Sequence, residues 1–166
     1  MRKKKIYKAS PGAQFNPKKA QDYGEELEKI AKENNGRLEP KIVIENARDE
    51  NSVLHACFNW DDSIAAKSWR RQQARALINH IEIVIQYENE EKTTKAFVNL
   101  VVQNGEEEEK SKYIPIEIVA KDEELRKQLI EEALKEIISW KKRYKEYQEL
   151  ALIFGAIKEV QSELSL

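Results

Sequence analysis

Apolar residues in the first third of the chain recur every three or four positions, which is the spacing of one helix face. A helix is predicted over residues 17–34, with an apolar side formed by Tyr23, Leu27, Ile30 and Ala31. Asn-Asn-Gly at 34–36 provides a helix stop. Residues 38–47, entered at Pro40, predict a second short helix that is buried on more than one side.

A third helix is predicted over residues 62–80, where Asp61 and Asp62 can accept from the free N–H groups of its first turn. One arc of this helix holds Ala65, Trp69, Ala76, Leu77 and His80. The opposite arc holds Lys67, Arg70, Arg71 and Arg75. We therefore expect Trp69 and Leu77 to be buried and the four cations to face solvent.

The next segment alternates apolar and polar residues, as half-buried strands do. Strands are predicted over residues 81–87, 94–102 and 113–119. Pro115 has no N–H to donate, so the third strand is expected to lie at an edge or to end early. The sequence thus predicts an α+β fold with N-terminal helices and a three-stranded antiparallel meander covered by helices on one face.

From residue 122 the pattern is helical without interruption to about residue 154. A seam repeating every 3.5 residues, as in a coiled coil, includes Ile130, Ile137, Trp140, Tyr144 and Tyr147. A straight helix of this length would measure about 50 Å at ~1.5 Å per residue, so it is expected to protrude, kink or pack on another copy. These five residues are the predicted homo-oligomer interface. Gly155 interrupts the pattern, and 156–166 form the predicted returning helix.

Changes in composition divide the chain into three parts. Residues 1–16 are basic and contain Pro11 and Gly12, which predicts a flexible arm. Residues 17–120 form the predicted domain of helices and antiparallel sheet, and residues 121–166 the long C-terminal helix with its short return.

The overall charge is close to balanced, with 29 Lys and Arg against 30 Asp and Glu. A protein that coats nucleic acid is usually clearly basic, so this balance argues against that role but permits a local basic patch. Cys57 is the only cysteine, which excludes an internal disulfide and fits a reducing cytoplasm. No segment reaches the ~20 apolar residues of a membrane span, so we expect a cytoplasmic protein without a membrane partner.

Candidate catalytic chemistry is sparse. His55 and Cys57 are close in sequence, but a metal site needs further ligands and the only other histidine is His80. A lone cysteine among apolar neighbours is more often a small core residue. Asp61, Asp62 and Glu82 have no spacing typical of an acid/base pair, and the chain has no glycine-rich phosphate loop. The sequence predicts no enzyme, metal or cofactor.

One segment carries a resemblance. The run FNWDDSIAAKSWRRQQARALI, at 58–78 and preceded by SVLHACF, resembles a pattern in small uncharacterised phage and prophage proteins. A strand pair and a long charged helix containing EIISWKKRYKEY complete the likeness, which covers residues 35–157. Val53 stands where that pattern has a proline, so the turn before the helix differs. The resemblance implies a phage or mobile-element origin and brings no established activity and no catalytic residues.

Two functions follow as expectations. In the first, a non-enzymatic accessory or regulatory protein contacts DNA or RNA through Lys67, Arg70, Arg71 and Arg75, assisted by the basic arm and by Lys141 and Lys142. In the second, a protein-interaction module binds or inhibits a host protein, which the balanced charge, the acidic run at 106–109 and the long helix favour. A merely solvated helix face remains an alternative explanation of the cations.

Overall fold

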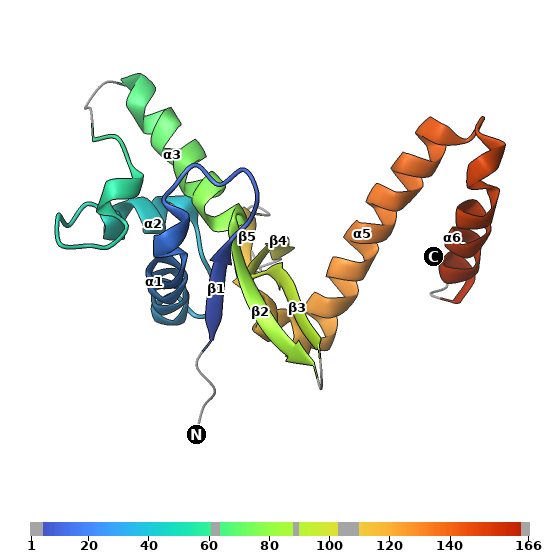
Figure 1. Cartoon of the computed structure of the whole chain (residues 1–166), viewed down its shortest axis with the longest axis horizontal. Coiled ribbons are helices and arrows are strands. Elements are labelled where there is room, and N and C mark those ends of the chain that lie inside the picture. Colours follow the sequence, from blue (N-terminus) through green and yellow to red (C-terminus); the bar gives the residue numbers. More distant parts are fainter. Residues whose placement is uncertain (1–4, 61–63, 88–89, 103–109, 164–166) are drawn as a thin grey trace. The chain divides into compact units, whose positions relative to one another are not determined.

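The computed structural model describes residues 5–60, 64–87, 90–102 and 110–163, and it confirms the predicted α+β fold (Figure 1). The chain forms two compact units, Met1–Val119 and Ala120–Leu166. The elements of the first unit are β1 (Ile6–Ala9), η1 (Pro17–Lys19), α1 (Ala20–Glu33), α2 (Pro40–Ala47), η2 (His55–Cys57), α3 (Ile64–Asn79), β2 (Ile81–Tyr87), β3 (Glu90–Lys95), β4 (Phe97–Val102) and β5 (Lys110–Pro115). The helix α4 (Ile116–Lys121) runs across the boundary, and α5 (Glu123–Tyr144), η3 (Gln148–Leu150) and α6 (Ala151–Glu163) follow.

The strands form two antiparallel sheets, β1-β2-β3 and β4-β5. The strand predicted over 94–102 is divided between them at Ala96. The Ala96 N–H donates to the Ile81 carbonyl oxygen at 3.0 Å, and the Ala96 carbonyl oxygen accepts from the Ile116 N–H at 2.9 Å. Ala96 therefore joins β3 to β4 along the chain and links β2 to the start of α4 through its backbone hydrogen bonds.

Part of the predicted flexible arm is a strand, which corrects that prediction. Ile6–Ala9 pairs with β2, with Ile6 opposite Val84 and Ala9 opposite Ile81. The Tyr7 side chain is buried, and a Cβ at position 24 of α1 would overlap its ring. Gly24 therefore lets β1 lie directly against α1. The Tyr7 N–H also donates to Gln21 Oε1 at 2.9 Å, which fixes the strand to the helix.

The third predicted strand, 113–119, is also only partly correct. Strand β5 ends at Pro115, and the chain then turns into α4. Proline removes one ladder donor, so the strand ends there, as expected for an interrupted ladder. Apolar residues that the sequence pattern placed on a strand then lie on a helix, where Val119 is buried.

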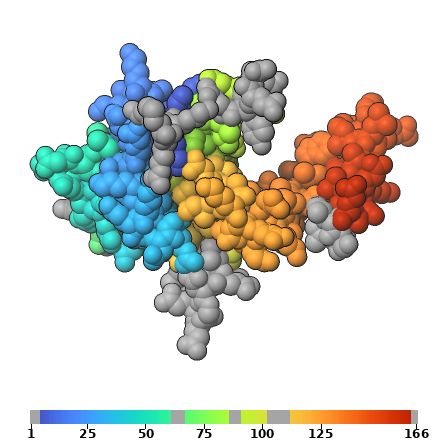
Figure 2. Space-filling model, turned by 90° about the horizontal axis from the view of Figure 1, so that it is seen from below, coloured from blue at the N-terminus to red at the C-terminus, as the bar shows by residue number. Residues whose placement is uncertain are grey.

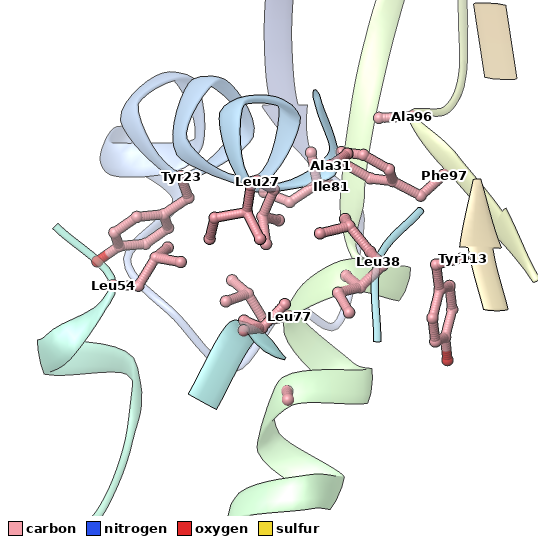
Figure 3. Packing of buried hydrophobic residues seen from close by; sticks show 14 of the residues in the cluster. Tyr23, Leu27, Ala31, Leu38, Leu54, Leu77, Ile81, Ala96, Phe97 and Tyr113 are labelled. Carbon is pink, nitrogen blue, oxygen red and sulfur yellow. The ribbon is translucent and has the colours of Figure 1, made fainter. Parts of the chain in front are cut away.

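The core of the first unit lies between α1, α3 and the strands (Figure 3). Leu27 and Ala31 point from α1 toward Leu77 of α3 and Ile81 of β2 (Figure 3). This confirms the apolar side predicted for α1, whose other members are Tyr23 and Ile30. The predicted helix stop is confirmed by positive φ angles at Asn35 (55°) and Gly36 (75°). On the surface of this unit, α1 (blue) and the α2–η2 segment (cyan) lie side by side (Figure 2).

The second unit is a helical hairpin (Figure 1). The Asp122 carboxylate caps α5 by accepting from the Leu125 N–H at 3.0 Å. Helix α5 ends at Tyr144, ten residues before the predicted end at 154, and α6 runs back beside it. The Trp140 ring packs against Tyr144 and Phe154, with centroids 5.3 and 6.0 Å apart. These aromatic contacts stabilise the return, and Gly155 lies inside α6 rather than interrupting it.

Candidate nucleic-acid interface

Helix α3 is oriented by three apolar residues in its C-terminal half. Ala74, Leu77 and Ile78 are buried at the i, i+3, i+4 spacing of one helix face. This face packs on α2 and on β4. These aliphatic residues therefore fix the rotation of α3 about its own axis. That rotation in turn determines which side chains of the N-terminal half face solvent. The caps predicted at Asp61 and Asp62 lie outside the described residues.

Arg70 is buried, which corrects its predicted place on the solvent face. It precedes Ala74 by four residues and Ile78 by eight, so it lies on the same row of the helix. Its side chain is 3% exposed, and its Nη1 donates to the Asn59 carbonyl oxygen at 3.1 Å. The guanidinium carbon lies 5.7 Å from the centroid of the Trp60 ring. The buried charge is thus stabilised by a carbonyl and an aromatic face.

Trp60 links several elements around this arginine. Its indole N–H donates to the His55 carbonyl oxygen at 3.0 Å, and its ring stacks on the His55 imidazole with centroids 5.0 Å apart. The Arg48 guanidinium carbon lies 5.9 Å from the same ring. The segment Asn59-Trp60, just before α3, is the sequence signal that could have indicated a buried Arg70.

Trp69 is exposed, which corrects the prediction that it is buried. Its side chain is 49% exposed, because the helix face that packs on the core lies on the other side. An exposed indole is a suitable surface on which an unpaired base can stack. The correction at Trp69 therefore changes a core residue of the sequence prediction into a candidate binding residue.

The remaining three predicted cations lie together on solvent-exposed helix surface. Lys67, Arg71 and Arg75 are spaced four residues apart, about 6 Å along the axis, and we call them the α3 basic face. Helix α3 contains no Asp or Glu. Within the part of the chain that the structure describes, the α3 basic face forms no ion pair, whereas lysines such as Lys5, Lys32 and Lys112 do. Its positive charge is therefore not neutralised by described carboxylates.

The two glutamines of α3 differ in their surroundings. Gln72 is exposed beside the α3 basic face. Gln73 is half-buried, and its Oε1 accepts from the Asn59 N–H at 3.3 Å. Gln73 therefore stabilises the loop before α3 through this hydrogen bond, while Gln72 is accessible to a ligand.

A cluster of charged groups joins α1 to β1. Glu28 accepts from the Tyr7 hydroxyl at 2.6 Å and from Lys5 Nζ at 2.9 Å, and it pairs with Lys32 at 2.6 Å. Burial alone would raise the pKa of Glu28, but the hydrogen bonds from Lys32, Tyr7 and Lys5 outweigh it and lower this pKa to about 2. Burial and the bond to Glu28 raise the pKa of Tyr7 far above its usual value. The cluster stabilises the fold, since its groups satisfy one another.

A cleft of about 560 Å³ lies beside Cys57. Its lining includes Tyr23, Lys19, Asn59 and Gln73. Burial raises the pKa of the Cys57 thiol, although Tyr23 and Lys19 act in the opposite direction. The thiol is therefore less reactive than a free cysteine.

His55 does not activate this thiol. Its Nδ1 lies 2.9 Å from the Ala47 carbonyl oxygen, and its ring is stacked on Trp60. Among the described residues, no group of three or more His, Cys, Asp or Glu side chains is arranged to hold a metal ion. The cleft thus offers neither an activated nucleophile nor a metal site formed by those residues.

Lys141 and Lys142, the other predicted nucleic-acid contacts, belong to α5 in the second unit. Lys141 Nζ lies 6.0 Å from the centroid of the Phe154 ring, so this side chain takes part in hairpin packing. Lys142 is exposed. Of the predicted oligomer residues, Trp140 is half-buried in the hairpin, whereas the others are exposed: Ile130, Ile137, Tyr144 and Tyr147.

No helix of the described chain is both long and apolar enough to cross a membrane. No protein-family model, curated protein or solved structure matches the sequence or the fold.

Proposed function

We propose that this protein is a non-enzymatic accessory protein, of the phage type that its sequence resembles, which binds nucleic acid through the α3 basic face. The observation that carries the proposal is the row Lys67, Arg71 and Arg75 on a helix without acidic residues, with no ion pair to any described residue. Phosphates bind such a row through charge and release of counterions, which requires no reading of base sequence.

Trp69 favours single strands as the ligand. Its exposed ring lies on the N-terminal half of α3, on the arc opposite Lys67 and Arg71, so a strand that contacts both must cross the helix. Bases in a duplex are already stacked on each other, whereas those in a single strand are free to stack on an indole. Three phosphate contacts would give a slope of log K against log salt of about −2 for single strands and about −3 for duplex DNA.

The direct test replaces the three cations and leaves the buried arginine intact. In Lys67→Glu/Arg71→Glu/Arg75→Glu, affinity for a labelled single-stranded oligonucleotide should fall roughly tenfold or more, and the salt slope should flatten. Fluorescence anisotropy across a salt series measures both. Arg70 is excluded because its substitution would disturb the core.

A matched control changes the net charge equally at other sites. Lys18→Glu/Lys29→Glu/Lys41→Glu replaces three exposed lysines of the first unit and should bind as the unchanged protein does. Trp69→Ala should weaken single-strand binding by about 1–3 kcal/mol and leave duplex binding nearly unchanged. Absence of binding by the unchanged protein at low salt, or an equal loss in the lysine control, would contradict the proposal.

A further inference from the structure

The cleft beside Cys57 has polar walls formed by segments that are distant in the sequence. Its volume of about 560 Å³ is typical of sites for small ligands. Its described lining includes four carboxamides, an aromatic ring and an ammonium group: Gln14, Asn16, Asn59, Gln73, Phe15 and Lys19. These groups come from the loop after β1, from η1, and from α3 and the loop before it.

The part of the wall at Asn59 is fixed by two backbone hydrogen bonds. The Asn59 N–H donates to Gln73 Oε1 at 3.3 Å, and the Asn59 carbonyl oxygen accepts from Arg70 Nη1 at 3.1 Å. The buried charge of Arg70 therefore holds this segment in place. The Phe15 ring is also held, since it packs edge-on against Tyr23 with centroids 5.5 Å apart. A wall that is already ordered loses little conformational entropy when a ligand binds.

The lining has the chemistry that recognises a nucleotide. A carboxamide offers both a donor and an acceptor, which match the donors and acceptors on the edge of a base. The half-buried Phe15 ring offers an apolar surface on which a base can stack. Lys19 supplies a positive charge for a phosphate, and the described residues of the lining include no Asp or Glu that would repel one.

Trp69 lies one helical turn from this cleft. It precedes Gln73 by four residues and Ala76 by seven, so the three lie on one side of α3. Gln73 lines the cleft, and Ala76 lines an adjoining cavity of about 50 Å³ that shares Phe15 and Cys57 with it. The exposed indole therefore stands on the side of α3 that faces the cleft, on the arc opposite the α3 basic face.

We infer that the cleft binds one unpaired nucleotide, with its base against Phe15 and the carboxamides and its phosphate at Lys19. When this nucleotide belongs to a single strand, a neighbouring base stacks on Trp69. A free nucleotide presents the same base and phosphate. The inference adds a second site to the proposed function, and it rests on that function only for nucleotides within a strand.

The Cys57 thiol provides the test, because Cys57 is the only cysteine of the chain and lines the cleft. Its reaction with N-ethylmaleimide is followed by mass spectrometry, with adenosine, guanosine, cytidine or uridine monophosphate or a single-stranded oligonucleotide present. At a nucleotide concentration about ten times its Kd, the rate should fall about tenfold, since only the empty cleft reacts. The oligonucleotide should protect at about tenfold lower concentration because of stacking on Trp69.

Two variants change exposed side chains of the lining. Lys19→Gln and Gln14→Ala should each weaken protection by free nucleotides about fivefold or more, whereas Lys18→Gln, outside the lining, should not. Protection is expressed as the ratio of rates with and without nucleotide, because Lys19 also lowers the pKa of the Cys57 thiol. Protection that both lining variants retain in full would overturn the inference.

The variant Lys67→Glu/Arg71→Glu/Arg75→Glu separates this inference from the proposed function. It should keep protection by free nucleotides while its affinity for strands falls. If neither free nucleotides nor strands protected Cys57, although strands still bound through the α3 basic face, the nucleotide site would be refuted and the proposed function would stand. Protection by free nucleotides alone would support the site and identify a free nucleotide as its ligand.

Discussion

The two units place their apolar side chains differently. In the first unit, buried residues from α1, α2, α3 and the strands form one cluster that includes Leu27, Leu38 and Phe97. In the second unit, Leu134 and Ile157 are the buried hydrophobic residues among those described, and large apolar side chains such as Leu152 and Tyr147 face solvent. The first unit thus has a core that can support its own folding, while the second leaves large apolar side chains in contact with solvent.

The two units also differ in the surroundings of their charged side chains. Arg70 lies in the first unit with its guanidinium held by the Asn59 carbonyl and the Trp60 ring. The charges of α5 lie on its surface, with Glu123 and Glu124 in its first turn and Lys141, Lys142 and Arg143 in its last. The buried charge is held in one position by its contacts, whereas the exposed charges of a helix surface are solvated and contribute little to stability.

The largest expected difference in stability is between a leucine truncated in the first unit and one truncated in the second. Leu27→Ala, at a side chain that is 0% exposed, should lower the free energy of unfolding by about 2–5 kcal/mol because it leaves a cavity. Leu152→Ala, at a side chain that is 90% exposed, should change it by no more than about 0.5 kcal/mol. Urea denaturation followed by circular dichroism measures both. Equal losses would refute the difference between the units.

An intermediate effect is expected from two arginines. Arg70→Met should cost about 1.5–3 kcal/mol, because the Asn59 carbonyl loses a charged donor and the Trp60 ring loses its cation. Arg126→Met, at an exposed position of α5, should be neutral within about 0.5 kcal/mol. Thermal unfolding compares the two variants at equal concentration. A stable Arg70→Met protein would show that this burial contributes nothing to stability.

A smaller effect, on the order of 1–2 kcal/mol, depends on pH. The pKa of Glu28 is about 2 in the folded protein against an ordinary value of 4.5, so its stabilisation is fully present above pH 4.5. It is lost as the pH falls from 4.5 toward 2. Glu28→Gln should therefore be less stable at neutral pH and lose less stability on acidification.

Melting temperatures between pH 7 and pH 2 measure this dependence. Glu136→Gln, which replaces an exposed carboxylate of α5, should retain the acid sensitivity of the unchanged protein. If Glu28→Gln and Glu136→Gln had the same pH profile, the Tyr7–Glu28 cluster would not contribute to the stability of the first unit.

Local patterns were sufficient to predict much of the fold. Tyr23, Leu27, Ile30 and Ala31 gave the buried side of α1, and the Asn-Asn-Gly stop adopts the positive φ angles that such a stop requires. The early end of the third strand at Pro115 follows from the missing N–H. These features depend on neighbouring residues alone, so a single sequence contains the information.

Three features were not predicted from the sequence: the strand β1, the buried side of the N-terminal half of α3, and the end of α5 at Tyr144. Each of them depends on contacts between residues that are distant in the sequence. Strand β1 has four residues and depends on β2 and on Gly24, far along the chain, for its place. The sequence prediction took the side of α3 that carries Trp69, its largest apolar residue, as the buried side. Arg70 is buried instead, because the Asn59 carbonyl oxygen and the Trp60 ring contact its guanidinium. Helix α5 ends without a glycine or proline, where aromatic packing of Trp140 on Phe154 stabilises the return. The sequence prediction therefore grouped the buried Arg70 with Lys67, Arg71 and Arg75, and it placed the exposed Trp69 in the core.

Gly24 also bears on how the protein avoids aggregation. Strand β1 occupies the hydrogen-bonding groups of β2 opposite Ile6–Ala9, and it can do so because position 24 has no Cβ to meet the Tyr7 ring. A side chain there would push β1 away and expose the edge of β2 as a template for strands of other chains. The edge that β1 itself presents is short and carries Lys8, which discourages further pairing. One absent methyl group on a helix thus protects the edge of a sheet.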